Sequence, residues 1–432
     1  MYKSLEVIDY ADQNGIGAQT FLEKYRAQVP LILLVTIVVQ SAVALPTFGQ
    51  WPLPVNVQNS ILVALAANIL GLLSYRRLRL YPGTRRLAFI LPSFAISWSL
   101  AFAVIVAARI SYSSVQLALG FASALGLALL LNAWSRRPDM APLLVVPSER
   151  VNTILSELPD LHHEPCRSIK DIDAAQSAIV ADLHADIPAA WENALAQAAL
   201  RGIPIYHVKQ VGESLTGRVQ IEHLSENTLG SLAPDSSYAF FKSMVERALA
   251  LVVLTVSAPV LLLAAIAIRI DSPGPSLFRQ TRIGYRGKPF TICKLRTMSQ
   301  ATGPRTLEDD MTLEDDPRIT RLGKLLRASR LDEIPQLLNV VRGEMSLIGP
   351  RPETERLSHW YAESIDFYAY RHIVLPGITG WAQVKQGHVA SQEDVMRKLQ
   401  YDFYYIKNFS LWLDLVIALK TIKVMLLKLG AK

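Results

Sequence analysis

The sequence predicts a membrane protein in three parts: four N-terminal transmembrane helices, a small α/β domain, and a mainly helical α/β domain with a re-entrant membrane helix. Three observations lead to this prediction. The 432 residues are 51% hydrophobic, which is too apolar for an ordinary soluble protein of this length. The apolar residues gather in five long runs, and the balance of charge changes sign twice along the chain.

Residues 1–138 are predicted to form a membrane domain. Four apolar runs there approach the length that a helix needs to cross a bilayer. They are residues 29–45, 57–74, 87–107 and 115–134. Arginines follow the second and fourth runs, whereas the other two connections carry only Arg109. By the positive-inside rule, both ends of this multi-pass bundle face the cytoplasm.

Residues 139–241 are predicted to form a small cytoplasmic α/β domain. Short strand-like runs at 143–146, 178–180 and 203–208 alternate with helical stretches such as 189–200. The order suggests a partial Rossmann-like fold, but no GxGxxG motif follows the first strand. The segment has 14 acidic against 6 basic residues, which would repel a pyrophosphate. A structural or regulatory role is therefore favoured over nucleotide binding, and the histidines at 162, 163 and 207 are interpreted as surface or strand residues rather than metal ligands.

Residues 242–432 carry 27 basic against 19 acidic side chains and open with a fifth apolar run, residues 248–268. If this run crossed the bilayer, the many basic residues that follow it would lie outside, against the positive-inside rule. Pro259 lies near its centre, where proline breaks or kinks a helix. We therefore predict a re-entrant helix over residues 244–270, broken at Pro259, that enters and leaves on the cytoplasmic face. A kinked fifth span is the alternative.

Two adjacent carboxylates, Asp332 and Glu333, lie in the stretch SRLDEIPQL at residues 329–337. An ionised aspartate can attack phosphorus, and a neighbouring glutamate can hold a divalent metal. Such a pair among fixed cations near a membrane points to phosphate chemistry on a lipid. A solvated helix face or a helix N-cap is the alternative, since LDE is a common tripeptide.

Several further motifs occur in a fixed order around this pair, from residue 242 to the end of the chain. They are DSPGP (271–275), FRQTRIG (278–284), KLRTM (294–298), DPRIT (316–320), MSLIGPRP (345–352) and PGITGW (376–381). Together they resemble the bacterial sugar transferase family, the monotopic polyprenyl-phosphate phosphoglycosyl transferases. The preceding parts are similar to the longer members of that family. Ala250 departs from the pattern, in which an aspartate is expected.

The resemblance implies transfer of a sugar-1-phosphate from a UDP-sugar to polyprenyl (undecaprenyl) phosphate, with release of UMP, at the start of exopolysaccharide or capsule assembly. It implies Asp332 as nucleophile of a covalent intermediate and a Mg²⁺ ion held by Glu333, with Asp332 sharing it. The bacterial inner membrane is the expected location, with the catalytic domain facing the cytoplasm. A catalytically silent scaffold that binds nucleotide-sugar or lipid, and a metal-dependent phosphatase, are the competing interpretations.

Basic residues around the pair are candidates for phosphate binding. They are Lys294, Arg296, Arg327, Arg330, Arg351 and Arg371. Arginine suits this role because its planar guanidinium donates two parallel hydrogen bonds and keeps its charge. Lys294 and Arg296 are two residues apart in a strand-like run, so they are predicted to share one face.

The last predicted element is an amphipathic helix over residues 411–429. Apolar side chains recur there at helical spacing beside three lysines, which suits either the membrane interface or packing on the domain. The expected partners are the UDP-sugar, the polyprenyl phosphate and the lipid bilayer, with no nucleic acid. The sequence leaves open the sugar, the pathway and whether the protein is a homo-oligomer.

Overall fold

The computed structural model divides into two compact units, Met1–Gly217 and Arg218–Lys432. It describes residues 25–49, 52–78, 86–134, 142–158, 161–175, 178–219, 234–299, 318–386 and 392–426. Among these residues, helices predominate and the sheets are small. The three-domain division at residues 138/139 and 241/242 stays a prediction.

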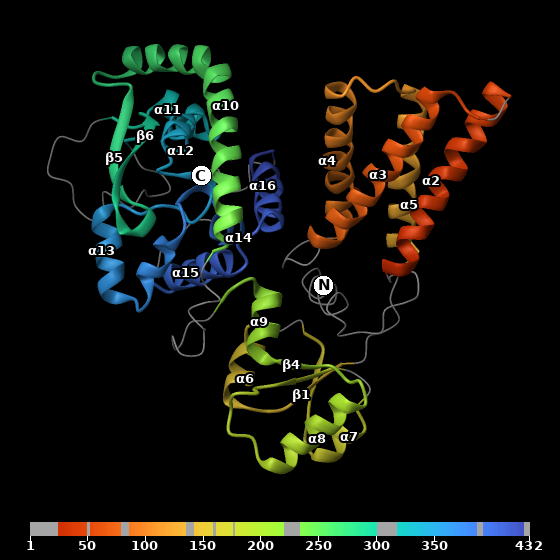
Figure 1. Cartoon of the computed structure of the whole chain (residues 1–432). Helices are drawn as coiled ribbons and strands as arrows, with labels where there is room; N and C mark the ends of the chain where they lie inside the picture. The colour runs from red at the N-terminus through yellow and green to blue at the C-terminus, as the bar shows by residue number, and fades with distance from the viewer. Residues whose placement is uncertain are drawn as a thin grey trace. The chain divides into compact units, whose positions relative to one another are not determined.

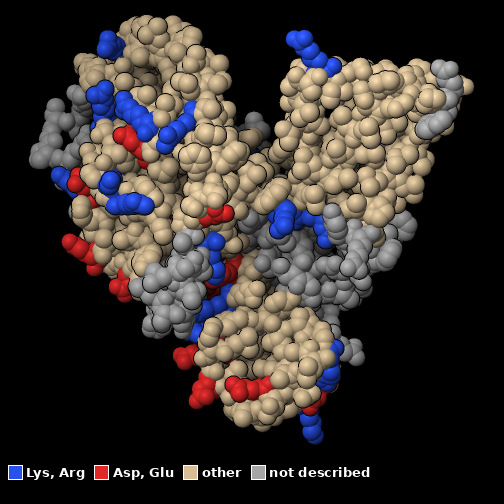
Figure 2. Space-filling view, viewed as in Figure 1, with Lys and Arg blue, Asp and Glu red and all other residues tan. Residues whose placement is uncertain are grey.

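Four long apolar helices come first in the chain (Figure 1). They are α2 (Tyr25–Phe48), α3 (Val55–Leu78), α4 (Arg86–Ala107) and α5 (Ser114–Trp134). Each is long and apolar enough to cross a bilayer, which confirms the prediction of several N-terminal apolar helices. Leu62, Leu91 and Leu130 on their outer faces are all more than half exposed. Figure 2 shows few charged side chains on the side of this bundle that faces the viewer, as a lipid-facing surface requires.

Inside the bundle, the Asn68 side chain forms hydrogen bonds to groups of the other three helices. The Asn68 amide donates to Thr36 Oγ1 over 2.9 Å and to the Gly120 carbonyl over 3.3 Å, and Trp98 Nε1 donates to Asn68 Oδ1 over 2.9 Å. An added Cβ at Gly120 would lie 2.6 Å from the Gln40 amide. Glycine therefore lets the helices approach closely, while the hydrogen bonds between helices specify how they pack.

The middle of the chain forms a parallel four-stranded sheet in the order β2-β1-β3-β4. Its strands are β1 (Leu143–Val145), β2 (His163–Pro165), β3 (Ile179–Ala181) and β4 (Ile205–His207). Its helices are α6 (Glu149–Ser156), α7 (Ile169–Asp173), α8 (Ala189–Leu200) and α9 (Val208–Thr216). The three strand-like runs and the helix at 189–200 thus occur where the sequence places them, whereas β2 was not predicted.

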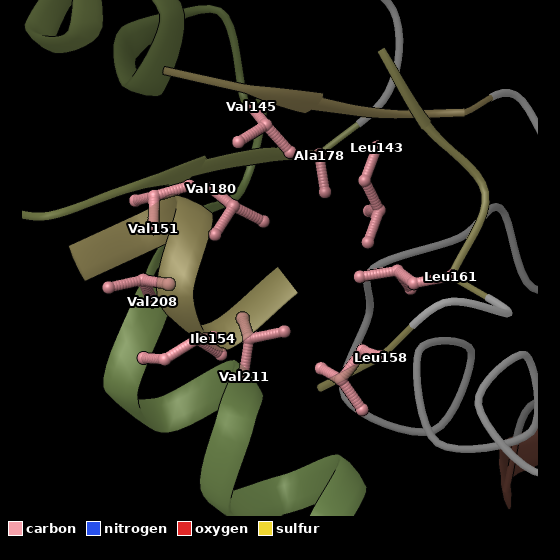
Figure 3. Packing of buried hydrophobic residues seen from close by; sticks show 10 residues of the cluster. All are labelled: Leu143, Val145, Val151, Ile154, Leu158, Leu161, Ala178, Val180, Val208 and Val211. Atoms are coloured by element: carbon pink, nitrogen blue, oxygen red, sulfur yellow. The ribbon is translucent and has the colours of Figure 1, made fainter. Parts of the chain in front are cut away.

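Helices cover both faces of this sheet. On one face, Val151 and Ile154 of α6 pack with Val208 and Val211 of α9 against Val145 and its neighbours (Figure 3). On the other face, side chains of α7 and α8 pack against alternate strand residues such as Leu144 and Ile179. Strands buried on both faces need continuous apolar runs, and β1 and β3 have them.

The second unit begins with the long helix α10 (Ser236–Asp271) and an antiparallel hairpin of β5 (Leu277–Ile283) and β6 (Pro289–Leu295). A short parallel pair, β7 (Ser346–Ile348) and β8 (Gly377–Thr379), lies further along the chain. The remaining helices are η3 (Tyr285–Gly287), α11 (Arg321–Ala328), η5 (Leu331–Gln336), α12 (Leu337–Arg342), α13 (Glu355–Ser364), η6 (Tyr368–Ile373), α14 (Trp381–Gln386), α15 (Gln392–Lys407) and α16 (Leu411–Leu426).

Helix α10 starts earlier than the predicted segment 244–270, because the Asp235 carboxylate caps its N-terminus by accepting from two backbone N–H groups. Figure 1 shows that the helix bends sharply. Pro259 lies within it, and the Ser257 hydroxyl donates to the Val253 carbonyl over 2.7 Å, a bond that often accompanies bending. Ala250 is buried among apolar side chains of β6 and α12, where a small side chain fits.

A buried ion pair joins the start of α10 to the last helix. Lys242 Nζ lies 2.6 Å from Asp414 Oδ2 of α16 and donates to the Tyr405 hydroxyl of α15 and to the Ile348 carbonyl, each over 2.8 Å. Both charged side chains are 8% exposed. Elements from three separate regions of the second unit therefore meet at one ammonium group.

Replacing Lys242 with methionine is expected to lower the free energy of unfolding by about 3–5 kcal/mol, since it leaves the Asp414 carboxylate buried without its cation. The double variant Lys242→Met/Asp414→Leu removes both of these charges and should recover part of that loss, while Glu246, whose Oε1 atom lies 3.5 Å from Lys242 Nζ, still loses its cation. Thermal or denaturant unfolding in detergent measures both effects. A double variant less stable than Lys242→Met would contradict this account of the pair.

The helix at the C-terminus has two apolar faces. Leu413, Val416 and Ile417 are fully buried against the unit, whereas Ile422 and Met425 are about half exposed. Helix α16 therefore packs on the second unit with one face and exposes apolar side chains on the other. Residues 427–429 of the predicted helix lie outside the described residues.

Candidate active site

Asp332 and Glu333 lie in the first turn of η5, which begins directly after Arg330, a residue with strained backbone angles. Helix α11 ends at Ser329, and Arg330 then adopts left-handed backbone angles of φ 58° and ψ 15°. Such angles are uncommon outside glycine and are found at functional sites. Pro335 sits within η5 before α12 begins. The chain reversal at Arg330 thus turns both carboxylates toward the β6 strand, which η5 contacts.

The Glu333 carboxylate is surrounded by three cations. Its Oε1 atom lies 3.3 Å from Lys294 Nζ, 3.2 Å from Arg351 Nη2 and 3.7 Å from Arg330 Nη1. Burial by itself would raise the pKa of Glu333, but Arg351, Lys294 and Arg330 outweigh it and lower the pKa to about 2. Glu333 is therefore ionised at every physiological pH, and its oxygen is held by hydrogen bonds.

Asp332 has the opposite environment. Its Oδ1 atom is buried and has no hydrogen-bond partner among the described residues. Burial and the charge of Glu333 raise the pKa of Asp332, against the effect of Lys294, Arg327 and Arg330. A carboxylate oxygen without donors keeps its lone pairs available, so Asp332 is the better nucleophile of the two.

Lys294 projects from β6 toward the pair. Burial and Arg351 lower its pKa to about 8, although Glu333 opposes this shift. The ammonium group is therefore close to losing its proton just above neutral pH. The structure brings Lys294, Arg330 and Arg351 together at Glu333, as the sequence proposed for the carboxylate pair.

Three other predicted phosphate-binding residues have different partners. Arg327 Nε donates to Thr297 Oγ1 over 3.0 Å, and its charge also acts on Asp332. Arg296 follows β6 and donates to the carbonyls of Ser272 and Pro273 at the end of α10, over 2.6 and 2.8 Å. It therefore holds the C-terminus of the membrane helix, and its role toward phosphate stays a prediction.

Arg371 is buried behind Arg351. It lies 2.8 Å from Asp402 Oδ2 and donates over the same distance to the Tyr368 hydroxyl and to the Arg351 carbonyl. Arg371 thus supports the backbone that carries Arg351, and direct contact with a phosphate stays a prediction for it as well.

Glu353 belongs to this support and was missed by the sequence analysis. It pairs with Lys398 and Arg371. Burial alone would raise the pKa of Glu353, but Lys398 and Arg371 lower it to about 2. The sequence signal that could have identified Glu353 is its position directly after the GPRP motif. A carboxylate so close to a candidate phosphate-binding arginine is a candidate for ion pairing with neighbouring basic residues.

Three glycines allow the GPRP and PGITGW loops to touch. A Cβ added at Gly377 would lie 2.1 Å from the Gly349 nitrogen, and one at Gly380 would lie 2.2 Å from the Gly349 oxygen. The Gly349 N–H donates to the Thr379 carbonyl, and the Gly377 N–H donates to the Pro350 carbonyl, each over 2.9 Å. This close backbone contact fixes the loop from which Arg351 reaches Glu333.

The carboxylate pair also fits a divalent cation. Mg²⁺ binds hard oxygen ligands and is commonly held by one or two carboxylates together with substrate phosphates. Asp332 Oδ1 is a buried carboxylate oxygen without a donor, next to an ionised Glu333. Lys294, Arg330 and Arg351 compete with a metal ion for the Glu333 carboxylate. A phosphate-bearing substrate is therefore needed to balance the positive charge of the three side chains and the ion.

Comparison with known proteins identifies the family of the chain. Residues 237–428 match the family model described as bacterial sugar transferase. An Aeromonas hydrophila UDP-N-acetylgalactosamine-undecaprenyl-phosphate N-acetylgalactosaminephosphotransferase is 38% identical over 407 residues, which cover 90% of this chain and 93% of that protein.

Two further relatives match over shorter stretches. UDP-glucose:undecaprenyl-phosphate glucose-1-phosphate transferases of Caulobacter vibrioides and Escherichia coli are 48% and 39% identical. Those matches cover 38% and 40% of this chain and 62% and 38% of the relatives. The predicted membership is confirmed, and the chain belongs to the bacterial sugar transferase family.

Proposed function

We propose that this protein transfers a sugar-1-phosphate from a UDP-sugar to undecaprenyl phosphate, giving undecaprenyl-diphosphate-sugar and UMP. This reaction begins the assembly of an exopolysaccharide or capsule. The names of the relatives support the substrates. The contrast between Asp332, whose Oδ1 atom has no donor, and the three-cation environment of Glu333 supports the chemistry.

The reaction proceeds in two displacements. The Asp332 carboxylate attacks the phosphorus that bears the sugar, a bond forms from its oxygen to phosphorus, and the bond to the bridging oxygen breaks so that UMP leaves. An oxygen of the lipid phosphate then attacks the same phosphorus and releases the Asp332 carboxylate. In each displacement the attacking oxygen enters opposite the leaving oxygen. The lipid phosphate therefore attacks from the side that UMP has left.

The neighbouring cations neutralise the charge that moves during these steps. Lys294, Arg330 and Arg351 surround the pair and are placed to contact diphosphate oxygens. Glu333, first, and Asp332 would hold Mg²⁺, which when bound neutralises the departing phosphate. Glu333 also keeps Lys294 and Arg351 oriented through its Oε1 atom.

The membrane arrangement follows from the helices. Helices α2 to α5 span the bacterial inner membrane, while α10 enters and leaves on the cytoplasmic side through its bend. The apolar side chains of α10 support this arrangement, since Leu262 and Leu263 are almost two-thirds exposed. The exposed apolar face of α16 lies at the interface, which keeps the carboxylate pair at the level of the lipid phosphates.

A labelling experiment tests this topology. A single cysteine placed at Lys288, in the β5–β6 turn, should react with an impermeant thiol reagent only after the cytoplasmic side is opened. Cys166 and Cys293 are buried and are replaced by serine or alanine beforehand. Reaction at residue 288 in sealed right-side-out cells would mean that α10 crosses the bilayer.

The pH dependence tests the charges at the site. We expect kcat/KM to fall on the acid side as Asp332 gains a proton, at a pH above the ordinary aspartate range because its pKa is raised. On the alkaline side it should fall as Lys294 loses its proton, at about pH 8. Lys294→Arg keeps its charge, so its alkaline limb should move to higher pH. An unchanged alkaline limb would exclude Lys294 as its source.

Turnover itself is tested with purified full-length protein, undecaprenyl phosphate and a panel of UDP-sugars, by following UMP release. UDP-N-acetylgalactosamine is the first donor to test, because it is named for the relative that matches over nearly its whole length; UDP-glucose and UDP-galactose follow. Donor binding without UMP release from any of them would favour the catalytically silent scaffold.

A further inference from the structure

The carboxyl edge of the middle sheet has the layout of a ligand site. In the order β2-β1-β3-β4, the chain passes from β1 to β2 on one side and later returns to place β3 on the other. Open parallel sheets bind ligands outside the carboxyl ends of the strands at such a reversal. Arg150 lies in the first turn of α6 after β1, Asp182 follows β3 and His207 ends β4, so polar side chains from three strand ends come to this edge.

Three of these side chains converge. One potential ligand atom from each of Asp182, His184 and His207 lies within 4.8 Å of the other two. His184 Nδ1 is 2.6 Å from His207 Nε2, which is 3.4 Å from Asp182 Oδ1. His207 was predicted to be a strand residue and not a metal ligand. Its two partners come from a loop more than twenty positions earlier in the chain, so no local pattern connects the three residues.

Asp182 is fixed in place by its own contacts. It is 5% exposed, its Oδ2 atom lies 3.3 Å from Arg150 Nη1, and its Oδ1 atom accepts from the His184 backbone N–H over 3.2 Å. Oδ1 is thereby directed toward the two imidazole rings. A buried carboxylate held in this way loses little conformational entropy when it binds an ion.

We propose that Asp182, His184 and His207 bind a divalent transition-metal ion of the zinc type. Two imidazole nitrogens and one carboxylate oxygen are a donor set that suits zinc and its neighbours. Three protein ligands leave one position open for water or for an anionic ligand at the sheet edge. This site is separate from the carboxylate pair Asp332–Glu333, which has only oxygen ligands.

Binding changes the hydrogen bonds of His207. Without a metal, His207 Nδ1 accepts from the Lys209 N–H over 3.0 Å and caps α9, so the ring proton is on Nε2 and faces His184. A metal on Nε2 displaces that proton to Nδ1, and the cap bond is lost without net release of a proton from His207.

Loss of this cap bond makes metal binding detectable as a change in helix α9. Helix α9 ends at Gly217, the last residue of the first unit. The metal therefore loosens the first turn of the last helix before the chain enters the second unit. Arg150, which lies beside Asp182, weakens binding by repulsion, so an affinity below that of closed structural zinc sites is expected.

The experiment uses full-length protein in detergent, stripped with a chelator and titrated with Co²⁺. With excess Mg²⁺ present to occupy the oxygen-only pair Asp332–Glu333, the expected result is one tightly bound Co²⁺ per chain with the visible absorption of a nitrogen- and oxygen-ligated ion, which Zn²⁺ displaces. His184→Asn should weaken binding by about 100-fold or more, since even residues behind the ligands change metal affinity about 10–100-fold. Zn²⁺ should also speed amide exchange at the start of α9 in the wild-type protein.

Controls separate this site from others. His162→Asn removes an exposed histidine of the same domain and should leave binding unchanged. His184 is exposed, so its replacement does not threaten folding, and it decides the question even if Asp182→Asn or His207→Gln fails to fold. Absence of stoichiometric Co²⁺ and Zn²⁺ binding, or equal affinity in His184→Asn, would overturn the proposal.

Discussion

Asp332→Asn is expected to reduce kcat by about 10⁴-fold or more, because asparagine has nearly the shape of aspartate but no anionic oxygen to attack phosphorus. The protein should stay folded and inserted. Asp332 Oδ1 is already buried without a donor, so removing the charge relieves a desolvation cost and should leave the melting temperature unchanged or raised. Asp366→Asn, at an exposed aspartate, is the matched control and should retain full activity.

The covalent step has its own test. Wild-type protein given a donor labelled in the sugar, without lipid acceptor, should retain sugar-phosphate after denaturation and release UMP in a single burst. Asp332→Asn should retain none and show no burst. Equal labelling of both proteins, or initial rates that require a ternary complex instead of a ping-pong sequence, would exclude Asp332 as the nucleophile.

Glu333→Gln is expected to lower turnover by about 100-fold or more and also to destabilise the unit. The carboxylate is the shared partner of Lys294, Arg330 and Arg351, and a neutral amide leaves these cations close together without their counterion. The melting temperature should therefore fall for Glu333→Gln but not for Asp332→Asn. Glu363→Gln, at an exposed glutamate of α13, controls for the loss of a negative charge.

The same variant separates two roles of Glu333. If Glu333 holds Mg²⁺, the activity that remains should need a higher Mg²⁺ concentration. If it only orients cations, the Mg²⁺ dependence should match that of wild type while KM for the UDP-sugar rises. A stable Glu333→Gln protein with wild-type turnover would contradict both roles.

The general organisation could be predicted from the sequence because it depends on local patterns. Apolar runs of the right length identified α2 to α5, and helix α8 begins and ends where its pattern predicts. Strand β2 was missed because its residues, His163 to Pro165, are all exposed and have neither alternation nor β-branched side chains. It is a strand only because β1 pairs with it.

The sequence supplied the residues of the candidate site, but most of the contacts between them could not be predicted from it. Asp332, Glu333 and Arg330 are adjacent in sequence, so their proximity was certain, whereas Arg351 reaches Glu333 only because the loops at Gly349 and Gly377 touch. Period-two alternation placed Arg296 on the face of Lys294, but β6 ends at Leu295 and Arg296 turns to the end of α10. Arg371 finds Asp402 over 31 positions, which no local pattern reveals.

The ion pair between Lys242 and Asp414 also sets an order of events during synthesis. The two residues are 172 positions apart, so α10 leaves the ribosome long before α16 exists. Until then the ammonium group of Lys242 has only the more distant Glu246 carboxylate, 3.5 Å away on the same helix, and burying it without the α16 carboxylate would be less favourable. The second unit therefore reaches its final packing only when the last helix arrives. A nascent chain stalled before residue 411 should remain sensitive to protease even though α10 is already complete.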